Sequence, residues 1–432
     1  MITDEELKTK MDYILEICTS IDLQYDKKKM LNNIANVTKS ASQKQLIVYE
    51  PNAIIICILK LFFYYNEIAS QNMCKWKRRR KCRLAKECYI NLLQVYIPEK
   101  SKEILEAVIN VIYEDKLWEF ETFCFEIMCS LLEYDVYNWP DTHETVTVIE
   151  RILNLFYISI TSSHATVNFM PYATFKKGLE VCIINMVKHV SNDHLLIIIQ
   201  HMCSWVVEKG MTDEIILDFG STLEYTAYVH EVTLYEKTLT PKIFPLLMEM
   251  IASTSKIISL LGNRVTQYLL DREENKMNFD TPKIFFEDIQ FDLTIEATYC
   301  TICLIAVEVP CGFIAAALVC LLMNVQDVTL KQTKHHVEVS KSYHIHATVI
   351  AVMSLLCWIH KAKAFYEYMN KVMMERAQWA PHLNPPIQSQ YNFAAHHILW
   401  NKPDLFFVDW EARYGLWKCF RLHETEEEPQ DT

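Results

Sequence analysis

Apolar residues recur at every third or fourth position along most of this chain, the spacing that places them on one face of an α-helix. The first such run begins at Leu7 and Met11, and Thr3 with Glu6 forms a capping box in front of it. The pattern at residues 224–239 alternates weakly and leaves helix or strand open. The other runs of helical spacing are residues 28–37, 53–65, 84–96, 101–113, 118–134, 146–160, 172–190, 194–209 and 212–222.

Pro, Asn, Asp and Ser residues divide these runs, and pairs of runs recur at roughly 40 residues, the spacing of armadillo and HEAT repeats. Several runs are apolar on more than one side, as expected of helices that pack between two neighbours in a solenoid. The sequence therefore predicts an all-α, armadillo/HEAT-like helical-repeat solenoid. A single large helical bundle is the structural alternative, although one core of this size is unusual.

The two most apolar segments are residues 297–323 and 345–359. The first is long enough to cross a bilayer, which takes about 20 apolar residues. Glu308 and Pro310 interrupt it, however, and a glutamate at membrane depth is costly unless protein covers it. We therefore predict two buried helices joined at residues 308–312, and a core helix in the second segment.

These patterns divide the chain into three predicted regions. Residues 1–243 hold helical repeats with a basic segment at 74–83, and residues 244–386 hold further repeats. Residues 387–432 form an aromatic and then acidic C-terminal tail, in which four of the five residues 424–428 are glutamates. Runs of like charge repel one another, so we expect this tail to be partly disordered.

Glycine is rare, with 6 in 432 residues, against an average usage of about 7%. The chain is thus poor in the residue that β-turns, phosphate-binding loops and nucleophile elbows require. It contains neither a Gly-x-Ser-x-Gly nor a Gly-x-x-x-x-Gly-Lys motif, the usual signals of serine hydrolases and nucleotide-binding loops. We predict no catalytic residue, no cofactor and no small-molecule substrate.

The chain carries a net charge of −12 and 15 cysteines without regular spacing. An excess of acidic residues argues against nucleic acid as a partner. An odd number of scattered cysteines, with no secretory leader in front of them, indicates reduced thiols in a cytosolic setting.

One basic segment opposes this acidic balance, and we predict that it binds lipid. Each Lys or Arg near an anionic leaflet contributes about 1 kcal/mol. Cys74 and Cys82 are candidate acylation sites, because one acyl chain plus a polybasic patch anchors a protein stably. A solvated loop between helices and a nuclear-import-like run are the alternatives. The predicted lipid-binding residues are Lys75, Trp76, Lys77, Arg78, Arg79, Arg80, Lys81 and Arg83.

Metal binding has weaker support. Cys300 and Cys303 are three positions apart, and His344 and His346 lie further along the chain, as do His335 and His336. The two cysteines fall inside an apolar predicted helix, where free cysteine is a common core residue. We therefore predict no metal site.

Two further sequence features resemble parts of catalytic sites but lack the other residues that such sites require. Leu217-Asp218-Phe219-Gly220 contains the tripeptide of a kinase magnesium loop, but no His-Arg-Asp loop accompanies it, so we interpret it as coincidence. Glu308 in apolar surroundings is a candidate for an acid with a raised pKa. A helix cap or a lysine partner is the simpler interpretation of that glutamate.

Within residues 244–386, several pieces occur in an order and spacing that resemble the rolling-blackout (Stambha A) family. Members of that family are α-helical-repeat scaffolds that tether the type III alpha phosphatidylinositol 4-kinase complex to the plasma membrane. The pieces are Phe244-Pro245-Leu246-Leu247; Leu269-Leu270-Asp271-Arg272-Glu273-Glu274-Asn275, similar to the family's Leu-x-Asp-Arg-x-x-Asn; Ile305-Ala306-Val307-Glu308; Val325-Gln326-Asp327; residues 346–375; and Ala380-Pro381-His382-Leu383-Asn384-Pro385, similar to its Ala-Pro-x-x-x-Pro.

The resemblance implies a non-enzymatic scaffold, peripheral on the cytoplasmic face of the plasma membrane. Its partners would be subunits of the phosphatidylinositol 4-kinase complex and anionic lipids. The family begins with a palmitoylated cysteine cluster, whereas residues 1–22 hold only Cys18. We therefore expect a divergent, shortened member whose anchor is absent or replaced by the segment 74–83. A soluble cytosolic helical-repeat adaptor for a protein partner, without a membrane role, is the alternative function.

Overall fold

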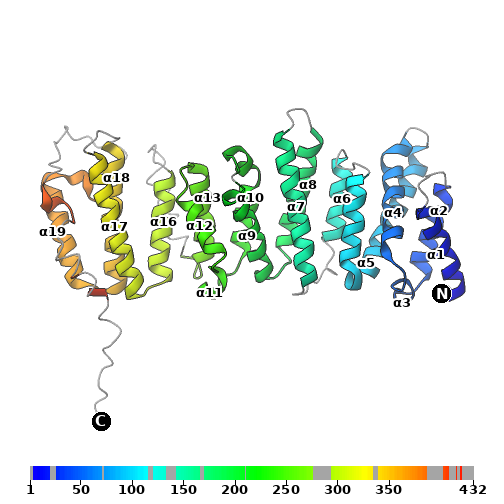
Figure 1. The fold of residues 1–432 in the computed structure, drawn as a ribbon, viewed down its shortest axis with the longest axis horizontal. Coiled ribbons are helices and arrows are strands. Elements are labelled where there is room, and N and C mark those ends of the chain that lie inside the picture. The colour runs from blue at the N-terminus through cyan, green and yellow to red at the C-terminus, as the bar shows by residue number, and fades with distance from the viewer. Residues whose placement is uncertain are drawn as a thin grey trace, which may run out of the picture. The chain divides into compact units, whose positions relative to one another are not determined.

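In the computed structural model, all regular structure within the described residues is helical, as predicted (Figure 1). The structure describes residues 3–19, 26–70, 73–114, 120–132, 143–165, 170–209, 211–275, 293–333, 339–386, 402–407, 415 and 419–420. The α-helices are α1 (Asp4–Thr19), α2 (Lys27–Ser40), α3 (Gln43–Leu46), α4 (Pro51–Asn66), α5 (Lys75–Glu114), α6 (Glu121–Leu132), α7 (His143–Ala165), α8 (Met170–Val187), α9 (Asn192–Val207), α10 (Asp213–Val229), α11 (Tyr235–Thr238), α12 (Ile243–Ile251), α13 (Lys256–Leu270), α16 (Leu293–Glu308), α17 (Gly312–Thr333), α18 (Val339–His360) and α19 (Lys363–Trp379). Short 3-10 helices lie at Ile68–Ser70, Pro381–Leu383 and Pro403–Leu405.

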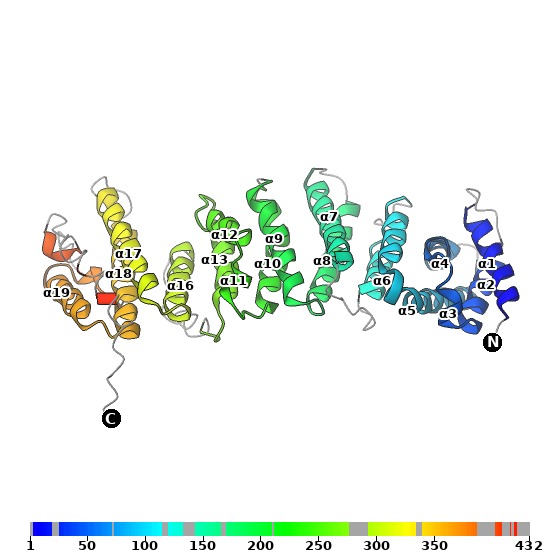
Figure 2. The same ribbon diagram turned by 60° about the horizontal axis from the view of Figure 1, so that its bottom comes forward.

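The chain separates into two compact units. Unit 1 consists of Met1–Trp205 and Gly210–Val229, and unit 2 of Val206–Lys209 and His230–Thr432. In each unit, helices pack against helices that lie near them in the chain, as in an armadillo-type solenoid (Figure 2). The predicted boundary between residues 243 and 244 falls at the start of α12, inside unit 2.

The helix α4 shows why the helices of unit 1 stack. It is apolar nearly all round, and the structure packs it against α1, α2 and α5. Pro51 occupies its first turn, where the missing N–H has no intrahelical partner to lose. Ile54, Ile58 and Phe62 are fully or almost fully buried. A helix without a polar face can only be stable between neighbours, and α4 has them on more than one side.

The basic segment is helical, which corrects the interpretation of it as a loop between helices. The helix α5 begins at Lys75, before the helical run that the sequence predicts at residues 84–96. The predicted break between the runs 84–96 and 101–113 is confirmed. The backbone is non-helical at Lys100 (φ −134°, ψ 41°), shortly after Pro98, so α5 consists of two helices joined at a kink. A proline removes one backbone hydrogen bond, which favours such a kink.

Two further local predictions are resolved in part. The amide of Glu6 donates to the Thr3 hydroxyl (3.4 Å), but the Glu6 carboxylate pairs with Lys10 (3.1 Å) and so does not complete the capping box. The ambiguous segment 224–239 contains no strand. It finishes α10 at Val229 and then forms the single turn α11.

In unit 2, α12 and α13 approach each other closely at Gly262. A Cβ added there would lie 2.7 Å from the Met250 Cβ and 3.0 Å from the Ile251 backbone nitrogen. Neither neighbour is the end of a flexible side chain, so only glycine fits. One of the few glycines in the chain thus serves helix packing.

The longest apolar segment folds as the two helices that the sequence predicts. The helix α16 ends at Glu308 and α17 begins at Gly312, with Pro310 in the break. Two stretches, Gly312–Lys331 and Ser342–His360, are long and apolar enough to cross a membrane, but about half of each is buried inside the protein (44% and 50%), so length and composition are weak evidence for a span. The shared core of α17 and α18 includes Leu318, Val319, Leu322, Ile350, Met353 and Leu356.

Part of the predicted C-terminal tail packs on the last helices. Residues 402–407, termed the C-terminal strap, place the side chains of Leu405, Phe406 and Phe407 in the core of unit 2. Their anchor is Arg376 of α19, whose side chain is fully buried. A strap that contributes core residues belongs to the folded unit.

Arg376 is a buried cation whose partners are neutral acceptors. Its Nε donates to the Leu405 carbonyl (2.7 Å), Nη1 donates to the Leu383 carbonyl (2.9 Å), and Nη2 donates to Gln326 Oε1 (3.3 Å). Burial lowers its pKa to about 9, so the side chain is still charged at neutral pH. Burial and the neighbouring Arg376 lower the pKa of His346 to about 3, which prevents a second positive charge in the same core.

Arg376→Ala is expected to destabilise unit 2 by several kcal/mol. The substitution leaves the buried carbonyls of Leu383 and Leu405 without their donor, and each buried unsatisfied polar group costs about 1–3 kcal/mol. Urea denaturation of the full chain measures the effect. Lys371→Ala, an exposed position on the same helix, is the matched control and should change stability by less than about 0.5 kcal/mol. Equal midpoints for the two variants would contradict an anchoring role.

Candidate functional site

The basic segment forms the first turns of α5 and lies beside the C-terminal end of α4. The Arg78 guanidinium donates to the Asn66 carbonyl (2.9 Å), and the Lys81 ammonium donates to the Tyr65 hydroxyl (3.3 Å). The C-terminal end of a helix carries partial negative charge, so cations beside it are stabilising. Arg78 and Lys81 therefore hold α5 against α4, and these two predicted lipid contacts have a structural role.

The remaining residues of the predicted set are exposed. Trp76 leaves 65% of its surface in solvent. Five cations lie on the same turns, and among the described residues none of the five has a hydrogen bond or ion pair. They are Lys75, Lys77, Arg79, Arg80 and Arg83.

These exposed charges work against the helix that carries them. The N-terminal end of a helix bears partial positive charge, which repels cations. Lys75, Arg79 and Arg83 are also spaced four residues apart, and like charges at that spacing destabilise a helix by about 0.2–0.5 kcal/mol per pair. The stability of α5 therefore does not account for them, and an anion from outside the chain would relieve the repulsion.

The helix α2 adds three lysines that the sequence did not connect to this segment. Asp26 caps α2 by accepting the amides of Lys28 (2.9 Å) and Lys29 (3.2 Å). The Lys27 ammonium lies 4.9 Å from the ring centroid of Tyr64 on α4. Desolvation and the nearby Lys28 lower the pKa of Lys81, which shows that the start of α2 lies close to α5.

Residues Lys27, Lys28 and Lys29 together with residues 75–83 are termed the basic cluster. Its two parts are far apart in the sequence, and each lies where a helix begins. The run of lysines after Asp26 was visible in the sequence, but only the packing of α2, α4 and α5 brings it beside the predicted segment.

The two candidate acylation sites differ in access. Cys74 precedes α5 and is exposed. The Cys82 sulfur lies 3.6 Å from Asn66 Oδ1, and burial raises the pKa of its thiol. Because the thiolate is the form of cysteine that reacts, Cys82 is the poorer acceptor of the two.

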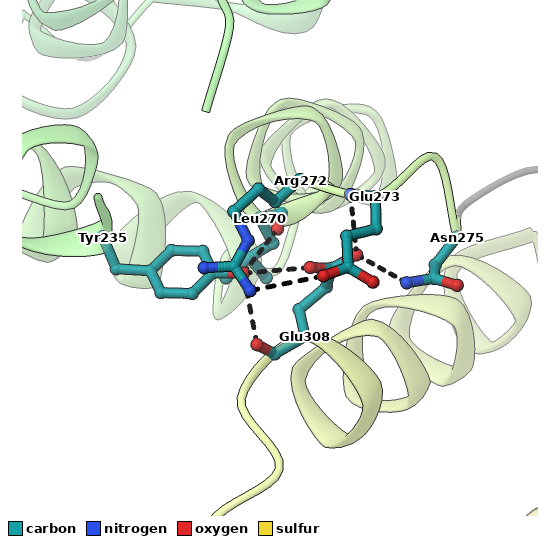
Figure 3. A network of polar contacts seen from close by, with 6 residues as sticks. All are labelled: Tyr235, Leu270, Arg272, Glu273, Asn275 and Glu308. Carbon is teal, nitrogen blue, oxygen red and sulfur yellow. Dashed lines mark hydrogen bonds and ion pairs between the residues drawn. The ribbon is translucent and has the colours of Figure 1, made fainter. Parts of the chain in front are cut away.

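A second polar cluster surrounds Glu308, the last residue of α16. The Glu308 residue is only 4% exposed. Its carboxylate accepts from the Tyr235 hydroxyl (3.1 Å), the Asn275 side-chain amide (2.8 Å) and the Glu273 backbone amide (3.3 Å). Figure 3 shows the carboxylate directed at the turn after α13, with Tyr235 and Asn275 on opposite sides. Desolvation and the Glu308 carboxylate raise the pKa of Tyr235, which keeps this donor protonated.

This arrangement corrects the interpretation of Glu308 as a helix cap or a lysine partner. Neutral donors surround it, and they come from α11 and from the turn after α13. The turn is the Asp-Arg-x-x-Asn piece and Glu308 ends the next piece, so the structure brings together two of the segments that carry the family resemblance. The cluster therefore connects α11, the turn after α13 and the end of α16 through hydrogen bonds.

The other motifs have structural roles where the structure describes them. Asp218 lies within α10 and pairs with Lys176 (2.7 Å), while Phe219 is fully buried. Cys300 and Cys303 are buried on α16. Within the described ranges, no three His, Cys, Asp or Glu residues lie close enough together to hold a metal ion. His335 and His336 lie outside those ranges.

A cavity of about 630 Å³ lies between α19 and the C-terminal strap. Its lining residues are Tyr368, Asn370, Lys371, Val372, Met374, Glu375, Pro403, Asp404 and Phe406. Serine, cysteine and histidine are absent from this lining, whose charged side chains are those of Lys371, Glu375 and Asp404.

The fold places the chain in the class of armadillo-type helical-repeat proteins, and a comparison with known families narrows the class. Residues 290–398 match the family described as EFR3, armadillo repeat. This range contains α16 to α19, and EFR3 is another name of the rolling-blackout family that residues 244–386 resemble. The match supports membership of that family through this region. No curated protein and no solved structure matches the chain.

Glu308→Ala is expected to destabilise unit 2 by about 2 kcal/mol or more, because it removes the acceptor of the Asn275 side-chain amide and of the Glu273 backbone amide. Glu308→Gln keeps an acceptor oxygen of the same reach and should lose less. The free energy of unfolding from urea titrations compares the two variants. If Gln were as damaging as Ala, the negative charge of Glu308, and not its hydrogen bonds, would matter.

Proposed function

We propose that this chain is a non-enzymatic helical-repeat scaffold that helps localise a phosphatidylinositol 4-kinase complex at the inner face of the plasma membrane. In this proposal the basic cluster contacts anionic lipid. The observation that carries the lipid contact is the set of five exposed cations on the first turns of α5, none of which pairs with another residue in the described ranges of the chain. The family match at residues 290–398 supports the scaffold role.

The magnitude of the charge effect is sufficient for membrane contact. At about 1 kcal/mol for each cation near an anionic leaflet, the five exposed cations would supply roughly 5 kcal/mol, and Lys28 and Lys29 add to this. Trp76 is exposed beside them, and tryptophan favours the boundary between lipid headgroups and acyl chains. The net charge of −12 resides elsewhere in the chain, so the contact would orient the protein.

Membrane attachment would be reversible unless a second signal is added. A polybasic patch alone gives salt-sensitive binding, whereas a patch with one acyl chain anchors stably. Cys74 lies directly before α5 and is exposed, so an acyl chain on its sulfur would enter the bilayer beside the basic cluster. Cys82 turns toward Asn66 and is less suited to this role.

Substitution of Lys75, Lys77, Arg79 and Arg80 by Ala is expected to reduce binding to phosphatidylserine vesicles at least about 100-fold at low salt, since four cations contribute about 1 kcal/mol each. Co-sedimentation with vesicles measures the binding. Binding of the unaltered chain should fall steeply between about 0.1 M and about 1 M salt, over which the Debye length shrinks from about 10 Å to about 3 Å. Arg78 and Lys81 are left in place because they hold α5 against α4.

The matched control replaces four exposed lysines outside the basic cluster, Lys39, Lys44, Lys177 and Lys188, by Ala. It changes the net charge equally and should retain binding. Equal binding by both variants, or equal uptake by neutral phosphatidylcholine vesicles, would remove the lipid role and leave the soluble adaptor as the function.

The kinase-tethering role is tested apart from lipid binding. Fusion of the chain to an anchor of the mitochondrial outer membrane should bring the catalytic subunit of the type III alpha phosphatidylinositol 4-kinase complex to mitochondria, as seen by fluorescence microscopy. The anchor without the chain is the control. An unchanged kinase distribution would contradict tethering even if vesicle binding is confirmed.

A further inference from the structure

The contact between α13 and α16 contains a chain of buried polar side chains. Thr301 of α16 lies at its centre, and its hydroxyl donates to Asn263 Oδ1 of α13 (2.8 Å) and to the Ala297 carbonyl of its own helix (2.9 Å). The Gln267 side-chain amide donates to the Thr301 hydroxyl (3.1 Å) and to the Ala297 carbonyl (2.9 Å). The Asn263 amide donates in turn to the Ser259 carbonyl (2.9 Å). The side chains of Asn263, Gln267 and Thr301 are termed the polar seam.

The polar seam is shielded from water. Asn263 is fully buried, and Gln267 and Thr301 are 4% and 5% exposed. A buried polar group that loses its partner costs free energy, because no water replaces the lost hydrogen bond. Apolar contacts are less selective, since one side chain can replace another of similar volume at small cost. The hydrogen bonds of the polar seam therefore specify which residues of the two helices lie opposite each other.

A slide of α16 along α13 would break this matching. One helical turn is 3.6 residues and about 5.4 Å long, so a shift of four residues best keeps the same face of α16 toward α13. Ala297 or Ile305 would then take the place of Thr301, and neither side chain has a hydrogen-bonding group. The side chains of Asn263 and Gln267 would face apolar groups in the core.

The other side of α13 is held against α12. The Ser259 hydroxyl donates to the carbonyl of Ile251, the last residue of α12 (2.8 Å). One turn further along α13, Gly262 lies so close to Met250 and Ile251 that a Cβ at this position would clash with both. Hydrogen bonds and close packing thus fix α13 against a helix on either side.

We infer that the polar seam is a register lock, which holds α16 at one position along α13 and makes α12, α13 and α16 move as one body. Sliding of packed helices is a shear motion by which proteins change shape. A single buried asparagine sets the register of paired helices in coiled coils, and here three matched polar side chains do so. The lock excludes shear between α13 and α16, so a change of shape in unit 2 takes place at other helix contacts.

Urea denaturation of the full chain tests the energetic part of this inference. Thr301→Val keeps the shape of the side chain but removes the donor to Asn263 Oδ1 and one acceptor of the Gln267 amide. It should raise the equilibrium constant of unfolding at least about tenfold, and Thr301→Ser, which keeps the hydroxyl, should restore most of the loss. The matched control is Thr266→Val, since Thr266 is buried on α13 and its hydroxyl donates to the Gly262 carbonyl of the same helix (2.7 Å). This control should change the constant less than about threefold.

Hydrogen exchange, followed by mass spectrometry of peptides, tests the register itself. A triple variant, Asn263→Leu with Gln267→Leu and Thr301→Val, has no polar group to strand, so its α16 can occupy more than one position along α13. Its α16 peptides should show two exchanging populations where the unaltered chain shows one, and its α18 peptides should stay unchanged. Thr301→Val alone takes its place in this measurement if the triple variant does not fold.

Two outcomes would overturn the inference. One is a Thr301→Val chain that is as stable as the unaltered chain. The other is a set of α16 peptides that exchange as one population, with unaltered protection, in the variant without the polar seam. Apolar packing alone would then set the register of α16.

Discussion

Each unit depends on the burial of apolar side chains between neighbouring helices whose backbone groups are already paired within each helix. The centre of α18 shows this, since Ile350, Met353 and Leu356 are fully buried. Each such side chain contributes about 1.5–3 kcal/mol relative to exposure. A helix that is apolar on several sides is stable only between other helices. Each such helix therefore needs a neighbour on either side to cover its apolar surface, and the same holds for the next helix along the chain.

Two buried charges are exceptions to this apolar rule, and both join connecting segments to the helices. Glu308 collects donors from α11 and from the turn after α13, whereas Arg376 collects acceptors from α17, the turn after α19 and the C-terminal strap. A buried charge is tolerable only when hydrogen bonds replace its lost water. Each charge therefore fixes the backbone of the segments that supply those bonds.

These two clusters give a physical meaning to the pieces that carry the family resemblance. Asn275 of one piece bonds to Glu308 of the next. Gln326 and Leu383 belong to two later pieces, and both accept hydrogen bonds from Arg376. These residues connect successive helices of unit 2 through hydrogen bonds. The pieces of the family resemblance follow one another along the chain in the order of the helices that these hydrogen bonds connect.

Helical periodicity, scarce glycine and the break at Pro310 determined the fold class and most helices from the sequence alone, because these features act over a few residues. The start of α5 at Lys75 was missed, because the pattern of apolar positions that predicts a helix begins only at Leu84 and the charged residues before it pack against the end of α4. The exposed cations of residues 75–83 were visible in the sequence. Only the tertiary structure shows that Arg78 and Lys81 donate hydrogen bonds to the end of α4 and that Lys27 to Lys29 lie beside them. It also shows that the donors to the Glu308 carboxylate are neutral. Each of these facts depends on contacts between residues far apart in the chain, which local pattern does not encode.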